Sequence, residues 1–248
     1  MNNYFRNALR LLLVMIVSLT SACSDDCHPL VSGVADYAEG GIYDKTDGDS
    51  DGSKGKMNYN GYTYEVVRIG TQWWMAENLR TTRYNDASLI SQVTDDDEWS
   101  DLTTGAWCDY DNDPANGAVY GKLYNWFAVT TGNLAPPGWH VPTGTDWGAL
   151  SAFLGGTLAA GKLLKESGTA HWESPNSGSN ASGFAALGGG GRFDFGPFYS
   201  LLDYAFFWTS SPSGSANAGY YTLSYDGSRF VGDVDDRSAG YSVRCIQD

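Results

Sequence analysis

The chain is poor in the residues from which most metal, redox and nucleic-acid sites are built. Only three His and four Cys occur among its 248 residues. Structural zinc sites usually take four ligands from these two residue types, so a zinc site is nearly excluded. Lys and Arg total 15 against 29 Asp and Glu, which gives a formal net charge of −14. Because phosphate binding needs clustered positive charge, the composition excludes a general nucleic-acid surface.

The apolar run near the N-terminus is too short to cross a membrane. Leu11–Leu19 holds about nine residues, whereas a membrane-spanning helix needs roughly 20. Arg6 and Arg10 precede this run, and the small residues of Thr20–Cys23 follow it. This order of segments predicts a secretory signal peptide over residues 1–22.

The end of this signal resembles a bacterial lipobox, in which Cys23 would receive lipid and become the mature N-terminus. Thr20 departs from the pattern, because lipoboxes usually carry Leu at that position. The alternative is an ordinary signal peptide with Cys23 as a bystander. Ser24–Asp26 resembles the surface-export signal of lipoproteins in Bacteroidota, or else forms an acidic spacer. We therefore expect an outer-membrane lipoprotein, anchored through Cys23 and exposed at the cell surface.

The next segment, residues 23–56, predicts a flexible acidic tether. Eight acids and one base occur within residues 23–52, which contain no Trp. A segment with high charge and little hydrophobicity cannot bury enough apolar surface to fold.

Residues 57–248 predict one aromatic-rich domain. All nine Trp lie in it, and its length suits a single core. Tyr62–Ile69 alternates with period two, Gly70-Thr71 supplies a turn and Gln72–Met75 continues, which predicts a β-hairpin.

Two helices are expected early in this domain. Lys122–Val129 has apolar residues at helical spacing. Thr143 and Asp146 resemble a capping box before an apolar face. This face consists of Trp147, Leu150, Phe153 and Leu154.

Beyond residue 180, Gly-rich turns separate short aromatic runs that predict antiparallel strands. These runs are Phe193–Phe195, Phe206–Trp208, Tyr220–Leu223 and Tyr241–Cys245. Two helices followed by paired strands predict an α+β fold.

Five ordered segments carry a family resemblance. They are GTQWWMAENLR (70–80), YGKLYNWFAV (120–129), LAPPGWHVPTGTDW (134–147), residues 183–189 and GYSVRCIQD (240–248). The domain resembles the Fibrobacter succinogenes major paralogous domain family, which consists mostly of secreted or lipid-anchored bacterial proteins. Two of the segments also resemble the formylglycine-generating, sulfatase-modifying enzymes. This likeness implies a C-type-lectin-like architecture, with two short helices and antiparallel strands.

The resemblance bears on the cysteines as well. Cys245 falls in a terminal segment that the resemblance makes structural, and an exported protein meets an oxidising environment. We expect Cys108 and Cys245 to form a disulfide, with a redox or metal-binding pair as the alternative.

An acidic cluster offers a candidate metal site. Asp109, Asp111, Asp113 and Asn116 present oxygen ligands of the kind that calcium prefers. Proteins of the C-type-lectin-like fold often bind calcium, so calcium is a candidate cofactor, although none is required. The alternative is a surface loop whose Asp and Asn side chains cap its own turns.

Aromatic residues in the late loop region are candidates for ligand binding. They are Phe193, Phe195, Phe198, Tyr199 and Tyr204. The corresponding region of lectin-like folds commonly makes the ligand surface, and flat rings stack on sugar faces or partner side chains. The alternative role for each ring is core packing.

The leading hypothesis is a non-catalytic, lipid-anchored envelope protein that presents a binding or adhesion domain. Its partners would be the membrane, through the lipid, and a glycan or another surface protein, but no nucleic acid. One alternative is an enzyme with a formylglycine-generating-like fold. Another is a structural component of a surface assembly.

Overall fold

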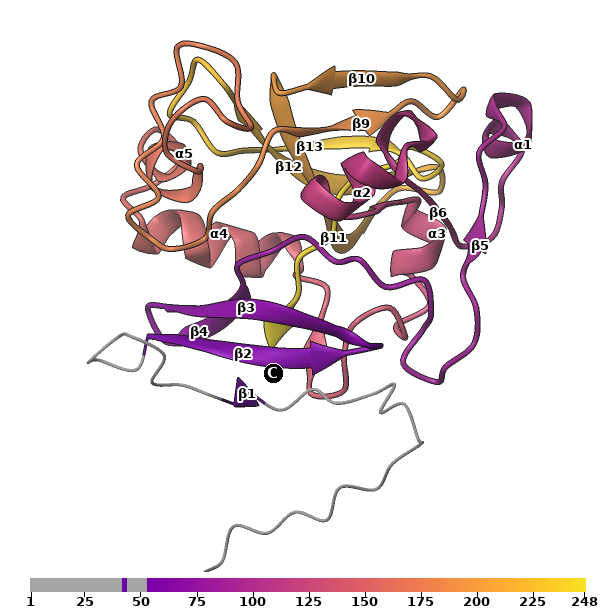
Figure 1. Cartoon of the computed structure of the whole chain (residues 1–248), viewed down its shortest axis with the longest axis horizontal. Helices are drawn as coiled ribbons and strands as arrows, with labels where there is room; N and C mark the ends of the chain where they lie inside the picture. The colour runs from indigo at the N-terminus through magenta and orange to yellow at the C-terminus, as the bar shows by residue number, and fades with distance from the viewer. Residues whose placement is uncertain (1–41, 44–52) are drawn as a thin grey trace, which may run out of the picture. The chain divides into compact units, whose positions relative to one another are not determined.

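The computed structural model describes residues 42–43 and 53–248 (Figure 1). The predicted signal peptide, the lipidation site Cys23 and most of the tether lie outside the described residues. Within them, the chain combines helices with mainly antiparallel sheets. The expected α+β class is confirmed as a mixture of helices and antiparallel sheets. None of the helices in this part of the chain has the length and apolar character to span a bilayer.

A six-stranded sheet joins the first strands of the domain to its last. Its strands are β1 (Ile42–Tyr43), β2 (Lys54–Tyr59), β3 (Tyr62–Ile69), β4 (Gln72–Met75), β8 (Trp139–His140) and β14 (Ile246–Gln247). The order is β1-β2-β3-β4-β14-β8. The predicted hairpin is confirmed as β3 and β4, which pair from Val66 opposite Met75 to Ile69 opposite Gln72. Strand β14 inserts between β4 and β8, so the C-terminus lies beside the early hairpin (Figure 1).

A five-stranded sheet forms the other main layer. Its strands are β9 (Gly189–Arg192), β10 (Phe198–Leu201), β11 (Tyr204–Ser213), β12 (Asn217–Ser224) and β13 (Val231–Asp236), in the order β10-β9-β11-β12-β13. A smaller sheet holds β5 (Ser91–Gln92), β6 (Ala106–Cys108) and β7 (Leu123–Tyr124).

Five α-helices occur among the described residues, so the expectation of two was wrong. They are α1 (Asp96–Ser100), α2 (Pro114–Tyr120), α3 (Trp126–Val129), α4 (Gly144–Phe153) and α5 (Ala160–Leu164). Helices α1 and α2 begin at the side-chain caps Asp95 and Asp113. Each is shorter than two full turns, so neither leaves a periodic apolar pattern in the sequence.

The two predicted helices have different outcomes. The segment 122–129 is divided, because Asn125 caps α3 with its side chain and the preceding residues form β7. Helix α4 is confirmed together with its capping box, in which Thr143 and Asp146 bond to each other's backbone N–H groups. Phe153 was wrongly placed on the buried face, since 65% of its surface is exposed.

The late strands are confirmed in part. Phe206–Trp208 lies in β11, and Tyr220–Leu223 lies in β12. The segment 193–195 instead begins a turn, closed by hydrogen bonds from Phe193 N to Pro197 O and back from Gly196 N. Tyr241–Cys245 forms isolated bridges rather than a strand, and regular pairing begins only at β14.

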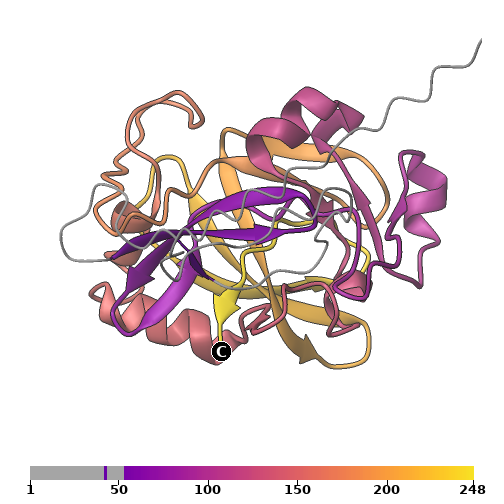
Figure 2. The same ribbon diagram turned by 60° about the horizontal axis from the view of Figure 1, so that its bottom comes forward.

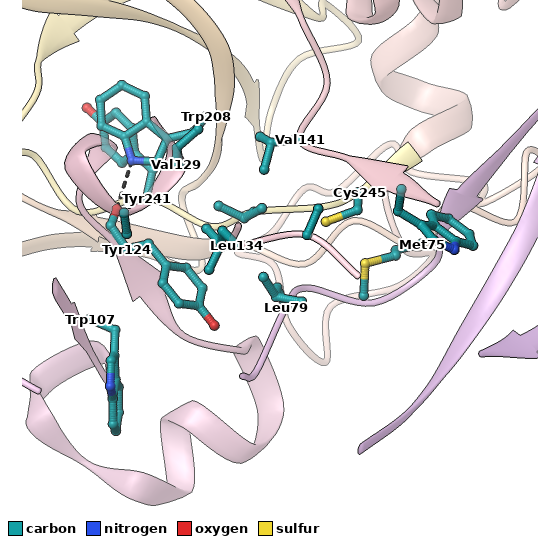
Figure 3. Packing of buried hydrophobic residues seen from close by; sticks show 14 of the residues in the cluster. Met75, Leu79, Trp107, Tyr124, Val129, Leu134, Val141, Trp208, Tyr241 and Cys245 are labelled. Carbon is teal, nitrogen blue, oxygen red and sulfur yellow. Dashed lines mark hydrogen bonds between the residues drawn. The ribbon is translucent and has the colours of Figure 1, made fainter. Parts of the chain in front are cut away.

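Helix α4 lies beside the five-stranded sheet (Figure 2), and its Trp147 ring packs against rings from both main sheets. The Trp147 ring lies 4.8 Å from that of Trp74 on β4, 5.6 Å from Phe207 on β11 and 5.5 Å from Phe230. Further buried residues form a second cluster around Trp208, whose indole N–H donates to Tyr124 O (Figure 3). The buried Trp residues of these two clusters include Trp74, Trp126, Trp139, Trp147 and Trp208.

Candidate functional site

Five aromatic rings form a continuous row on the five-stranded sheet and its β9–β10 turn. In order along this aromatic row they are Phe195, Phe193, Tyr199, Phe206 and Tyr204. Successive ring centroids lie 4.8, 3.9, 5.4 and 5.7 Å apart. All of these contacts are stacked except that of Tyr199 with Phe206, which is tilted by 49°. The row therefore unites four of the five predicted ligand-binding residues.

Strand alternation sets which rings of β11 join the row. Tyr204, Phe206 and Trp208 project from one face of the strand, because side chains alternate between the faces of a sheet. Ala205 and Phe207 belong to the cluster around Trp147 on the opposite face. Gly190 on β9 pairs in parallel with Ala205, which brings the β9–β10 hairpin and its rings beside β11.

The turn that carries Phe193 and Phe195 is held in place by Arg192. The Arg192 side chain is fully buried, and its Nε donates to Gly196 O at 2.5 Å. Its Nη atoms donate to the carbonyl groups of residues 93–95 and to the Asp96 carboxylate at 2.8 Å. The guanidinium also lies 4.3 Å from the Trp99 ring centroid. These contacts fix the base of the turn against the start of α1.

Hydroxyl and carboxylate groups lie along one side of the row. The Tyr199 hydroxyl lies 2.8 Å from that of Tyr241, which in turn donates to the Asp235 carboxylate. Burial raises the pKa of both tyrosines far above the usual range, and the nearby Asp235 charge adds to this effect. Asp233 sits opposite Tyr220 in the β12–β13 pairing. Burial and these two carboxylates raise the pKa of Tyr220 to about 12.

The two ends of the row are exposed, Phe193 and Tyr199 are half-buried, and Phe206 is covered. Phe195 is 59% exposed and Tyr204 is 38% exposed, while Phe206 is 7% exposed. The outer rings can therefore stack on a flat apolar surface, and the neighbouring carboxylates can accept hydrogen bonds from hydroxyl groups. This combination suits a ligand with both apolar faces and hydroxyl edges.

Phe198 does not join the row. Its ring lies 5.3 Å from that of Tyr110 and 4.8 Å from the Arg192 guanidinium, on the other side of β10 from Tyr199. Sequence reasoning also missed Phe206, Tyr241 and Asp235. The period-two spacing of Tyr204, Phe206 and Trp208 could have revealed the first of these.

Three of the four residues of the predicted calcium site have another partner, and the fourth, Asp111, lies in a short turn with a φ of +54°. Asp109 is buried and forms a 2.5 Å salt bridge with Lys122. Asp113 accepts a hydrogen bond from Ala115 N at the start of α2, and Asn116 donates to Tyr110 O. In residues 42–43 and 53–248, no three His, Cys, Asp or Glu side chains gather as a metal site. Calcium binding at this loop stays a prediction.

The two cysteines of the domain lie in different clusters. Cys108 packs with Trp99 and Leu123, whereas Cys245 packs near Met75 (Figure 3). Both side chains are buried. Burial raises the pKa of both, to about 12 for Cys108. The disulfide between them stays a prediction.

These features define a mixed helix-and-sheet domain, mainly β, that carries an aromatic surface. Its sequence matches the Fibrobacter succinogenes major domain family over residues 67–247. The chain therefore belongs to that family, as its five motifs predict. Comparisons with curated proteins and with solved structures gave no match.

Proposed function

We propose that this protein is an exported, lipid-anchored binding protein whose aromatic row binds a neutral glycan. The observation that carries the proposal is the stacked series of rings between exposed Phe195 and exposed Tyr204, bordered by Asp194, Asp233 and Asp235. Sugar rings present flat CH faces to aromatic rings and hydroxyl groups to carboxylates.

The negative charge of these carboxylates favours neutral glycans over acidic ones. Each of the three carboxylates lies close enough to a tyrosine of this region to raise the pKa of its hydroxyl. A uronic-acid or sulfated chain would meet the same negative potential and be repelled. A neutral polysaccharide avoids this cost and uses the carboxylates as hydrogen-bond acceptors.

The rings of the aromatic row are held in place before any ligand binds, and this favours a ligand-binding role for them. Arg192 fixes the turn of Phe193 and Phe195, and the Tyr199–Tyr241 contact fixes the next ring. Side chains that are already ordered lose little entropy when a ligand stacks on them. A C-type-lectin-like architecture belongs to the same proposal and is supported by the motif likeness at residues 138–147 and 240–245.

A pull-down on insoluble neutral polysaccharides, with soluble glycans as competitors, tests the binding proposal. Phe195→Ala and Tyr204→Ala each remove an exposed ring and should weaken binding by about tenfold. Phe153→Ala is the matched control, because Phe153 is 65% exposed on α4, away from the row. Equal binding by all four proteins would refute the row as the site. Repeating the assay with a chelator tests the calcium prediction.

The location at the outer membrane is a separate part of the proposal. It rests on the lipobox-like sequence before Cys23 and on the acidic residues that follow it. Cells grown with radioactive palmitate should label the wild-type protein but not Cys23→Ala. Unchanged label in this variant would refute lipidation at Cys23. Protease added to intact cells then tests surface exposure.

A further inference from the structure

A separate cavity of about 160 Å³ lies where four chain segments meet. The first segment comes directly after β4, and the second is the C-terminal end of α2. The third comes before β9, and the fourth comes before β14. Two guanidinium groups, those of Arg80 and Arg244, line the cavity together with the Glu77 carboxylate. Val119 and Leu187 supply apolar walls.

Arg244 is a buried cation whose hydrogen-bond partners are all neutral. It is 1% exposed, and its Nε donates to Asn78 Oδ1 at 2.7 Å. Its Nη atoms donate to backbone carbonyl groups, including Ala185 O at 2.9 Å. Burial lowers the pKa of Arg244 to about 9, so it stays charged at neutral pH. No salt bridge to Arg244 occurs among residues 53–248. The Glu77 charge favours the cation without bonding to it, and an anion in the cavity would add a direct partner for this buried charge.

Arg80 provides a second guanidinium group at the cavity, on a side chain that is 24% exposed. Its Nε is shielded from solvent and has no hydrogen-bond partner within the described part of the chain. Its Nη2 donates to Thr63 O at 3.3 Å and to Glu77 Oε1 at 3.2 Å. The other oxygen of Glu77 accepts from Glu65 N at 2.7 Å. Glu77 thus bonds directly on the Arg80 side and acts on Arg244 only through its charge, so one carboxylate serves two guanidinium groups.

We propose that this cavity binds a small carboxylate with a short apolar body. A carboxylate is planar and accepts paired hydrogen bonds from guanidinium groups, which here come from Arg80 and Arg244. Val119 and Leu187 would contact the carbon chain. The small volume of the cavity favours a ligand with a few carbon atoms. This site is distinct from the aromatic row and does not depend on glycan binding.

The test is a ligand-observed NMR titration of the purified full-length protein with sodium butyrate, at ionic strength held constant with sodium chloride. We expect saturable binding in the millimolar range. Arg80→Met should raise the apparent dissociation constant by about tenfold or more, because it removes a charged donor. Val119→Trp places an indole at the wall of the cavity and should weaken binding at least as much. Both substituted residues are partly exposed, so the variants should fold.

Matched controls separate this site from general charge and surface effects. Arg68→Met removes an exposed cation from β3, and Val234→Trp alters a valine that is 47% exposed, as Val119 is. Both controls, and Phe195→Ala, should bind butyrate as the wild type does. The proposal is overturned if the wild type does not bind butyrate, or if Arg80→Met and Val119→Trp bind it unchanged. Displacement by phosphate at a lower concentration than by propionate would refute the carboxylate assignment.

Discussion

The hydroxyl group of Tyr199 lies 2.8 Å from the hydroxyl group of Tyr241. Tyr199 belongs to β10 at one edge of the five-stranded sheet. Through Tyr241 it is linked to Asp235 on β13 at the other edge. The two edge strands are therefore joined beneath the aromatic row by side chains as well as by the sheet. Several expectations depend on this arrangement.

Tyr241→Phe should destabilise the fold without removing a ring. The change keeps the stacking of residue 241 on Phe206, at 4.9 Å, but removes its hydroxyl bonds to Tyr199 and Asp235. The loss of two such bonds should cost about 1–3 kcal/mol in the free energy of unfolding. Urea denaturation measures this cost. An unchanged midpoint would show that the hydroxyl network does not stabilise the sheet.

Gly196→Ala should disturb the turn that carries Phe193 and Phe195. Gly196 has a φ of +114°, and an added Cβ would lie 2.4 Å from the Cβ of Asp96. Gly132→Ala is the control, since Gly132 also has positive φ, at +74°, but has open space around it. The backbone strain alone costs about 1 kcal/mol. Denaturation should show a larger loss for Gly196→Ala, and polysaccharide binding should fall only in that variant. Equal effects of the two changes would contradict this account of the turn.

Asp146→Asn should make the protein less stable in a pH-dependent way. Burial opposes ionisation, but hydrogen bonds from the Thr143 hydroxyl and backbone N–H, with His140 nearby, hold the pKa of Asp146 below its usual value. The stabilisation is therefore present above the unfolded pKa of about 4 and is lost as pH falls through the lower folded pKa. We expect a cost of about 1 kcal/mol at pH 7, which shrinks as the pH falls below about 4. A cost that does not change with pH would contradict the assignment.

The disulfide between Cys108 and Cys245 can be tested directly on exported protein. Digestion without reduction, after free thiols have been alkylated in denaturant, should yield the two cysteine peptides joined. Mass spectrometry then identifies the linked pair. Recovery of both peptides in alkylated form would refute the disulfide. In the native protein, burial should keep any free thiol at these positions unreactive, because a raised pKa leaves little thiolate.

Much of the fold could be predicted where a local pattern was long enough. The β3–β4 hairpin has clear alternation, and α4 has a capping box at Thr143 followed by ten helical residues. Phe153 differs from the other apolar residues of this helix. At about 100° per residue, Leu150 and Leu154 lie near Trp147 on the helix surface, but Phe153 lies about 120° away. The helix buries a narrow stripe, so Phe153 faces solvent.

The site was predictable residue by residue but not as an arrangement. Aromatic composition identified Phe195 and Tyr204, yet their connection through Phe206 depends on the parallel pairing of Gly190 with Ala205. This pairing joins β9 and β11, which are neighbours in the sheet but are separated by β10 along the chain. No local sequence pattern encodes such a pairing. The short Asp-capped helices escaped prediction for a related reason, since their stability comes from tertiary contacts such as that of Trp99 with Arg192.

The most direct measurement of the central claim is a glycan array probed with the wild-type protein and with Phe195→Ala, each from residue 24 onward. We predict that the wild type binds neutral glycans, does not bind uronic-acid or sulfated glycans, and loses its signal on substitution of Phe195. Binding confined to acidic glycans, no binding to any glycan, or an unchanged signal in Phe195→Ala would contradict the claim that the aromatic row is a neutral-glycan site.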